Sequence, residues 1–450
     1  MQQPVLKALA AAAFACAAAP SFALDLMDAY VKAQAHDPTL AAAQAELAAG
    51  REKAVQGRSL LLPQVQLATK ATYLKDNSSS NNLPAQLQDV VKPNASGTLH
   101  EVAIEAKQPI WAAKSRAEKK QLEQQTELAE VKHRDAQQEL IQRVAQTYFD
   151  VLLAEENLRV ARAEKAAMTK SRDRAQARFD VGRGRITELQ EAQARLDGVI
   201  TREVQAQGSL ELRRTQFEEL TGAKALGLSG LAGGFAPQPP QPDSAAAWQQ
   251  QAATGNTRVL ARQGELSIAS FEIGKYNLAA RPTLDLVVST SYKGQSGGLS
   301  ELTAPDGKRS TAIGLQLAVP LYAGGGITSK ERESVAKRLQ AEQLLVAAQR
   351  DARLQAQDAY LTVKTGVSRI GSLEQAVRSD TTALEATTLG RDVGTRTELD
   401  VLDAQQRLHS SQRDLAQARN DYLIGRIKLA AAAGELKEGD LAALNAFLAR

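Results

Sequence analysis

The chain has almost no cysteine, and this absence is the first guide to where it acts. Its single cysteine, Cys16, lies in an apolar N-terminal run from Ala8 to Pro20. This run follows Lys7 and is closed by Ser21-Phe22-Ala23, the order of a secretory signal peptide with a small-x-small cleavage site. We therefore expect residues 1–23 to be removed. The exported mature chain then has no cysteine and no disulfide.

Long apolar runs and an excess of one charge are also missing. After the signal peptide, no segment offers the roughly 18 consecutive apolar residues of a membrane helix. Lys and Arg number 55 against 51 Asp and Glu, with both signs interspersed, and this balance argues against a nucleic-acid partner. Aromatic residues make up only 4% of the chain. The chain therefore either stays outside the bilayer or crosses it as strands.

Residue patterns for chemistry are absent as well. The four histidines are scattered through different predicted elements, and no nucleophile–base pair, zinc motif or phosphate loop is found. We therefore expect no enzymatic activity, no cofactor and no dedicated metal site. The histidines are His36, His100, His133 and His409.

Proline is missing from two long stretches, which predicts unusually long helices. There is none from Ile110 to Ala236 and none after Pro320, and from Ala112 to Val181 glycine is absent too. One helix of about 70 residues there would be about 100 Å long. The pattern predicts two helical hairpins and two shorter helices: 112–181 with 187–220, 328–391 with 397–433, and 38–60 and 256–277.

The chain is internally duplicated. Asp180-Val-Gly, followed by Ala192-Gln-Ala-Arg-Leu196, returns at the same spacing as Asp392-Val-Gly, followed by Ala404-Gln-Gln-Arg-Leu408. The segment Val102–Trp111 returns as Ile313–Tyr322. A unit of roughly two hundred residues is too long for a solenoid repeat, so we expect a duplicated domain.

Four segments alternate apolar and polar residues and are predicted strands: 64–75, 100–109, 283–292 and 311–320. Each has about the length of a tilted transmembrane strand. Alternation alone also fits half-buried strands of a soluble sheet. Two long polar or glycine-rich loops, 77–97 and 294–308, favour the membrane barrel. Four strands cannot close a barrel and lipid tolerates no open edge, so if these strands span the membrane, several chains must pool them.

With these features, the chain resembles the TolC family of outer-membrane efflux and secretion ducts over nearly its whole mature length. The residues that carry the resemblance are Arg178-Phe-Asp-Val-Gly182, Ile186-Thr-Glu-Leu-Gln-Glu-Ala192, Pro282-Thr-Leu-Asp-Leu286, Pro320-Leu-Tyr-Ala-Gly-Gly325 and Val393-Gly-Thr-Arg-Thr-Glu-Leu-Asp-Val-Leu-Asp-Ala404. Each motif is weak alone, but their order and duplication are specific.

The resemblance implies a mainly α-helical chain with a membrane β-barrel. In a homotrimeric duct, twelve strands form the shared barrel, and twelve helices form an α-barrel below it, surrounded by a mixed α/β equatorial belt. The implied partners are outer-membrane lipid, a periplasmic adaptor (membrane fusion protein) and an inner-membrane ABC or RND transporter. The implied location is the outer membrane of a Gram-negative bacterium with a periplasmic extension, and the implied activity is the passage of drugs or secreted polypeptides.

This plan divides the chain into five parts. After the signal peptide at 1–23, a first structural repeat covers 24–235 and a proline-rich linker covers 236–242. A second repeat covers 243–436, and a short C-terminal equatorial tail covers 437–450.

Two acidic residues form the predicted gate. Asp400 and Asp403 are three residues apart, so both carboxylates lie on one side of a returning helix near its N-terminus. In a trimer they would form rings around the axis, where mutual repulsion raises some of their pKa values and favours cation binding and block. The alternative is that they complement the helix dipole and face solvent.

The resemblance also supplies tethers and docking tips. It implies that Arg396, Thr187 and Glu188 hold the inner helix pair closed. Arg391 stands where some relatives carry an aromatic tether, so the closed network differs in detail. The implied adaptor-docking tips are Val181-Gly182-Arg183 and Val393-Gly394-Thr395, whose glycines suit a positive φ.

Two other classes of protein remain open at this point. A soluble periplasmic coiled-coil scaffold or adaptor would share the long helices but has no need of two duplicated strand pairs. A lipidated RND-type multidrug outlet would be cleaved before Cys16, although Ala13-Phe14-Ala15 is a poor lead for that site. The cargo and the specific transporter are not encoded in these patterns.

Overall fold

The computed structural model describes residues 24–75, 95–232, 235–299 and 307–449. The predicted signal peptide with Cys16, residues 77–94 of the first predicted polar loop and residues 300–306 of the second lie outside these ranges. The described chain divides into two compact units: unit 1 comprises 24–43, 133–259 and 348–449, and unit 2 comprises 44–132 and 260–347. Among the described helices, none has a stretch apolar and long enough to cross a bilayer.

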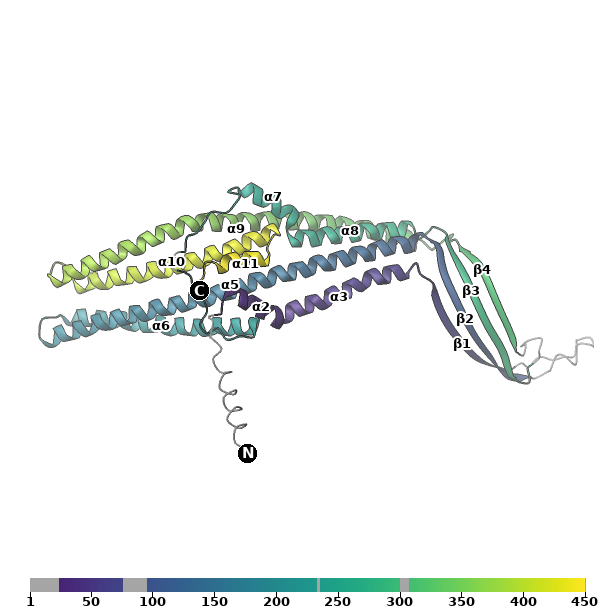
Figure 1. Ribbon diagram of the computed structural model, residues 1–450, viewed down its shortest axis with the longest axis horizontal. Helices are drawn as coiled ribbons and strands as arrows, with labels where there is room; N and C mark the ends of the chain where they lie inside the picture. Colours follow the sequence, from purple (N-terminus) through teal and green to yellow (C-terminus); the bar gives the residue numbers. More distant parts are fainter. Residues whose placement is uncertain (1–23, 76–94, 233–234, 300–306, 450) are drawn as a thin grey trace, which may run out of the picture. The chain divides into compact units, whose positions relative to one another are not determined.

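Long helices dominate the chain, as the proline map predicts (Figure 1). Helix α5 has 68 residues and α9 has 67, and each contributes to both units. The helices are α2 (Leu26–His36), α3 (Pro38–Ser59), α5 (Ala113–Asp180), α6 (Ile186–Thr221), α7 (Ala245–Gly255), α8 (Thr257–Asn277), α9 (Gly326–Asp392), α10 (Glu398–Ala433) and α11 (Glu438–Asn445).

Unit 2 contains one antiparallel sheet of four strands in the order β1-β2-β3-β4. They are β1 (Gln64–Lys75), β2 (Ser96–Ala112), β3 (Thr283–Gly297) and β4 (Lys308–Ala318). Strand β1 matches its prediction, whereas β2 and β3 are longer, because pairs such as Gly97 with Gly297 continue the ladder beyond the alternating residues. Within the described residues, β1 pairs only with β2 and β4 only with β3.

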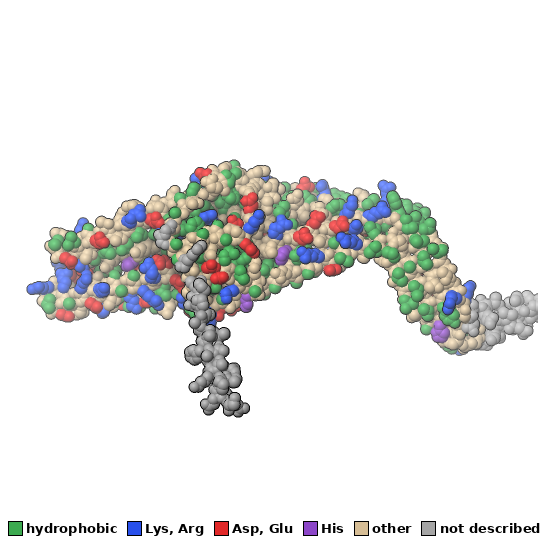
Figure 2. Space-filling model, in the orientation of Figure 1, with side chains coloured by type: hydrophobic (Ala, Val, Ile, Leu, Met, Phe, Trp, Pro, Cys, Tyr) green, Lys and Arg blue, Asp and Glu red, His purple; other side chains and the backbone are tan. Residues whose placement is uncertain are grey.

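The strand register sorts side chains onto two different faces. One row across the sheet joins Val65, Ala106, Val288 and Ile313. The opposite face carries ion pairs, Lys107 with Asp285 at 2.9 Å and Lys293 with Glu101 at 3.0 Å. Figure 2 shows hydrophobic side chains gathered over the strands, and Ile313 is 75% exposed. The apolar row is therefore uncovered within a single chain.

Unit 1 holds the main hydrophobic core, built by α2, α5, α6, α9, α10 and α11. Its largest side chains include the fully buried Tyr148, Phe217 and Tyr422. The Tyr148 hydroxyl donates to carbonyl oxygens of Ser229 and Leu24, at 2.9 and 3.1 Å. Burial is the main reason that the pKa of Tyr148 is raised. This core fixes the roots of the two helical hairpins.

Three short helices, α2, α7 and α11, were not predicted. Helix α2 is capped by Asp25, whose side chain accepts from the backbone N–H of Asp28. Helix α11 lies in the segment expected to be a C-terminal tail, and its Leu441 and Leu444 are buried in the core. The five-part division of the chain stays a prediction.

Candidate functional site

The two hairpins of unit 1 end in turns of the same construction. At the α5–α6 turn, the Gly182 N–H donates to the Phe179 carbonyl at 2.9 Å and the Arg183 N–H to the Arg178 carbonyl at 2.8 Å. This pair of bonds is the Schellman motif, which needs a left-handed residue. Gly182 has a φ of 73°. The predicted positive φ is confirmed.

The α9–α10 turn repeats these bonds. The Gly394 N–H donates to the Arg391 carbonyl at 3.0 Å and the Thr395 N–H to the Gly390 carbonyl at 2.8 Å, with a φ of 81° at Gly394. Both turns present apolar side chains to solvent, Val181 at 68% and Val393 at 67% exposure. The predicted docking tips are therefore exposed loops on a defined backbone.

Asp400 caps the helix on which it lies. Its carboxylate accepts from the Thr397 N–H at 2.8 Å and the Thr397 hydroxyl at 2.9 Å, while the Asp400 N–H donates back to that hydroxyl. This is a capping box. Hydrogen bonds from Thr397 and the nearby charge of Arg396 hold the pKa of Asp400 below its usual value. Within one chain, Asp400 thus caps its own helix, a role that the sequence analysis did not predict.

Asp403 is paired with the other hairpin. Its Oδ1 lies 2.7 Å from Nη1 of Arg195 on α6. Arg195 also contacts Glu191 at 3.3 Å. The two predicted gate carboxylates therefore have different partners: Asp400 is held by its own turn, and Asp403 is joined to α6.

The predicted tethers are not joined to one another within the chain. The guanidinium of Arg391 lies 2.7 Å from Asp392 and 3.4 Å from Glu398, so both its ion pairs stay inside the α9–α10 hairpin. Thr187 and Glu188 lie in the first turn of α6. Among the ion pairs of the described residues, none joins Arg396 to Glu188.

Glu398 is a tip residue that sequence reasoning missed. Its side chain is only 8% exposed, and its Oε1 has no hydrogen-bond partner. Arg195 was missed as well, although it lies in the repeated Ala192–Leu196 motif. A carboxylate one helical turn before it, Glu191, was the available signal.

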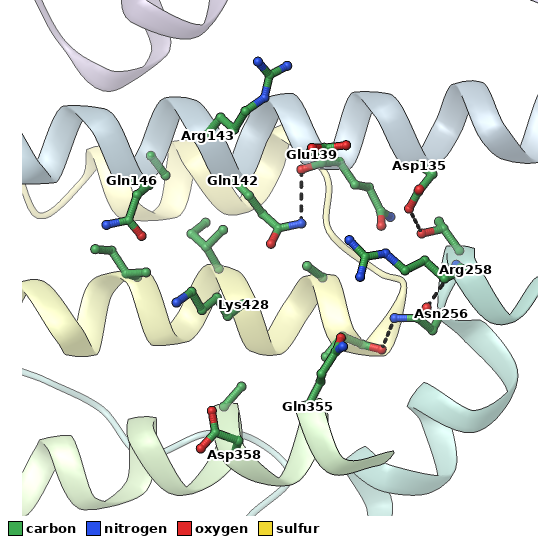
Figure 3. A pocket seen from close by; sticks show the side chains of 18 of the residues that line it. Asp135, Glu139, Gln142, Arg143, Gln146, Asn256, Arg258, Gln355, Asp358 and Lys428 are labelled. Carbon is green, nitrogen blue, oxygen red and sulfur yellow. Dashed lines mark hydrogen bonds between the residues drawn. The ribbon is translucent and has the colours of Figure 1, made fainter. Parts of the chain in front are cut away.

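A separate polar cavity of about 540 Å³ lies elsewhere in unit 1, between α5, α10, α9 and the start of α8. Figure 3 shows polar side chains of these helices around the cavity, with Arg143 pointing away from it. They are largely bonded to protein: Asn256 donates to the Ala432 carbonyl at 3.0 Å, and Thr257 bonds Asp135. No cluster of three or more His, Cys, Asp or Glu residues in the part of the chain that the structure describes is arranged to hold a metal ion.

Comparison with known proteins decides the family. The family model described as "Outer membrane efflux protein" matches residues 29–223 and 248–435. The chain belongs to this outer membrane efflux protein family. It is 33% identical to the outer membrane protein TolC of Vibrio cholerae over 429 residues, which are 95% of this chain and 94% of that protein.

Other relatives agree in sequence and fold. The alkaline protease secretion protein AprF of Pseudomonas aeruginosa is 29% identical over 94% of this chain and 86% of its own length. The solved structure of CusC superimposes with a TM-score of 0.77 at 16% identity, covering 92% of both chains, a likeness of fold alone. The fold is thus that of a channel subunit with strands for a membrane β-barrel and helices for an α-barrel.

Family membership places the protein in the outer membrane with a periplasmic extension, as an exit duct for secretion or efflux. The soluble scaffold predicted as an alternative is therefore wrong. The family consists of channels, which is in line with the expectation that the chain is not an enzyme.

Proposed function

We propose that three copies of this chain form one passive duct, which opens when its periplasmic end docks to partner proteins. The observation that supports a trimer is the pairing of strands in the sheet. Its edge strands β1 and β4 are each paired on one side only among the described residues, and open edges are not stable in lipid. Three copies of the four-stranded sheet supply twelve strands for a closed barrel.

The cargo is handed to the duct from the inner membrane. Relatives named for protease secretion and a family described by efflux favour an ABC or RND transporter that acts through a periplasmic adaptor (membrane fusion protein). The adaptor docks at the tips Val181-Gly182-Arg183 and Val393-Gly394-Thr395. Their exposed valines on hydrogen-bonded turns offer an apolar anchor whose backbone is already ordered.

The gate lies at the α9–α10 turn. Rings of Asp400 and Asp403 constrict the closed duct and attract cations. Arg396 and Glu188, together with Thr187, tether neighbouring hairpins in the assembly, because the single chain leaves Arg396 and Glu188 exposed or half-exposed near the tips. Arg391 supports these tethers from within, since its ion pairs with Asp392 and Glu398 hold the α9–α10 turn. In the trimer, repulsion between carboxylates opposes the lowering of the pKa of Asp400.

Single-channel conductance in planar bilayers tests the proposal. We expect small cation-selective steps that divalent or polyvalent cations block, and we expect Asp400→Ala/Asp403→Ala to abolish the block. A folded oligomer that inserts no channel would overturn the duct. Channels whose block survives in the double variant would overturn the gate.

Mass determination of the mature N-terminus separates this duct from a lipidated RND-type outlet. Cleavage after Ala23 supports the non-lipidated form, whereas an acylated Cys16 would establish the lipidated one.

A further inference from the structure

A buried carboxylate lies in the middle of the helical hairpins, away from both tips. The side chain of Glu164 on α5 is 1% exposed. One of its oxygens, Oε1, accepts from Nη2 of Arg202 at 2.7 Å, and Oε2 accepts from Nη1 of Arg413 at 3.2 Å. Each oxygen of one carboxylate thus holds a different arginine. Burying a charge demands such partners.

The two arginines belong to different hairpins. Arg202 lies on α6, which follows α5 in the first hairpin, whereas Arg413 lies on α10 of the second. Among the described residues, only two ion pairs join the two hairpins, Glu164 with Arg413 and Asp403 with Arg195. The second is open to solvent, with Asp403 46% exposed, so its attraction is screened more strongly. Glu164 is the buried link.

Apolar contact between the hairpins is thin in the same stretch. From Gly371 to Asp392, α9 has no buried residue, so α10 alone attaches the second hairpin there. In the cluster nearest the tips, α10 contributes only Leu402, packed against five residues of α5 and α6: Met168, Ala175, Ala192, Leu196 and Val199. Between Leu402 and Ala418, the next α10 residue of the main core, α10 also buries Ala404, Leu408 and His409, which belong to neither apolar cluster. The contact of Glu164 with Arg413 spans the gap between these apolar clusters.

We propose that Glu164 is a latch between the two hairpins, released when Arg413 withdraws on opening of the duct. This inference rests on the proposed function, in which the second hairpin moves against the first. Arg413 is 31% exposed and lies on the other hairpin, so it is carried away when the hairpins separate; Arg202, which is 44% exposed, lies on the same hairpin as Glu164 and stays beside it. The buried carboxylate therefore keeps one partner throughout. This avoids the large free-energy cost of breaking a buried ion pair, which arises when a buried charge is left without a partner. Arg202 makes the latch reversible.

The two arginines therefore affect opening with opposite sign. In Arg413→Gln the latch is lost and Glu164 remains paired with Arg202, so the open fraction rises on the order of tenfold, as expected for loss of one charge-assisted hydrogen bond. In Arg202→Gln the carboxylate depends on Arg413 alone, so the open fraction falls. Single-channel recording of open probability, with oligomer integrity checked by heat-modifiable gel mobility, measures both.

A double variant supplies the second test. Glu164→Gln raises the open fraction as Arg413→Gln does, and combining the two adds little, because both remove the same contact. The latch is overturned if Arg202→Gln and Arg413→Gln shift opening in the same direction, or if Arg413→Gln shifts nothing. If these variants do not shift opening as expected while Asp400→Ala/Asp403→Ala still loses cation block, the proposed duct is supported and only the latch is rejected. If the unmodified protein forms no channel, both proposals fall together.

Discussion

At the scale of single residues, the pairing of Asp403 with Arg195 decides how much negative charge the proposed gate presents. The guanidinium lies 2.7 Å from the carboxylate, so it neutralises part of the field that a cation entering the throat would meet. We expect Arg195→Gln to strengthen divalent-cation block several-fold, because Asp403 is then free to bind the cation. Dose–response curves of block in planar bilayers measure this.

A matched control for that substitution lies on α10. Arg407 is exposed and takes part in none of the ion pairs of the described residues, so Arg407→Gln removes the same charge without freeing Asp403. Block that strengthens equally in both variants would point to a general charge effect and away from a specific role of Asp403.

His409 makes the stability of the helical part of unit 1 depend on pH. The side chain is 8% exposed, and burial lowers its pKa below 6.5, outweighing the nearby charge of Glu164. Below about 6.5 the unfolded chain therefore binds a proton that the folded chain resists, so stability falls as the pH falls through this range. We expect amide hydrogen exchange along α10 to accelerate between pH 7 and pH 5.5, relative to intrinsic rates.

The substitution His409→Gln should remove that acceleration. His36 on α2 is exposed and provides the control, because His36→Gln removes an imidazole that is not buried. If the exchange of α10 keeps its pH dependence in His409→Gln, another group is responsible.

At the scale of elements, the sequence predicted the long helices and the hairpin turns well, because these depend on local signals. Gaps in proline and glycine delimit α5 within about one residue of its observed ends, and the repeated glycine marks both Schellman turns. The ion pairs of the same helices were not predictable. Glu164 is flanked by Arg162 and Lys165 like any solvated helical carboxylate, and only the packing of three helices shows that it is buried.

The strands illustrate the same division. Alternation predicted β1 at its observed bounds, but not the extension of β2 to Ser96, where no apolar pattern marks the strand. There the neighbouring strands supply the pairing: Gly97 and Thr98 pair with both β1 and β3, and Ser96 pairs with Lys75 of β1. Non-local pairing of this kind leaves no signal in the local sequence.

The turn glycines make a prediction about the tips. A Cβ at Gly394 would meet nothing within 4 Å, so the left-handed backbone alone penalises alanine there. We expect Gly394→Ala to destabilise the tip by about 1–2 kcal/mol, seen as faster hydrogen exchange from Leu389 to Leu399. Gly208, inside α6 with equally open space, is the control. Gly208→Ala should instead stabilise by about 0.5–1 kcal/mol, and a destabilising Gly208→Ala would mean that the space around these glycines is filled in the assembly.

At the scale of the whole molecule, the sheet and the helices differ in how apolar and charged side chains are distributed over their surfaces. The sheet shows one apolar and one charged face, and the row containing Ile313 is uncovered within the chain. The helices carry charges of both signs over their surface (Figure 2), which suits water on their outer side. The apolar face of the sheet is therefore matched to lipid, whereas its charged face and the surface of the helices are matched to water.

The proposed membrane orientation of the sheet follows from adjacent positions on β4. Ile313 belongs to the apolar row with Val288 and Val65, whereas Ala312 lies opposite Ser289 on the other face. If the apolar face meets lipid, Ile313→Arg places a charge in hydrocarbon at a cost of about 2–4 kcal/mol, while Ala312→Arg places it in the water-filled lumen. We expect the first variant to lose assembled trimer in outer-membrane fractions on gels of unheated samples, and the second to assemble and alter ion selectivity. Because the two positions are neighbours on one strand, general damage to β4 would affect both equally. If instead Ile313→Arg assembles and Ala312→Arg does not, the charged face of the sheet faces lipid. The apolar face would then line the lumen, and the proposed orientation of the sheet would be wrong.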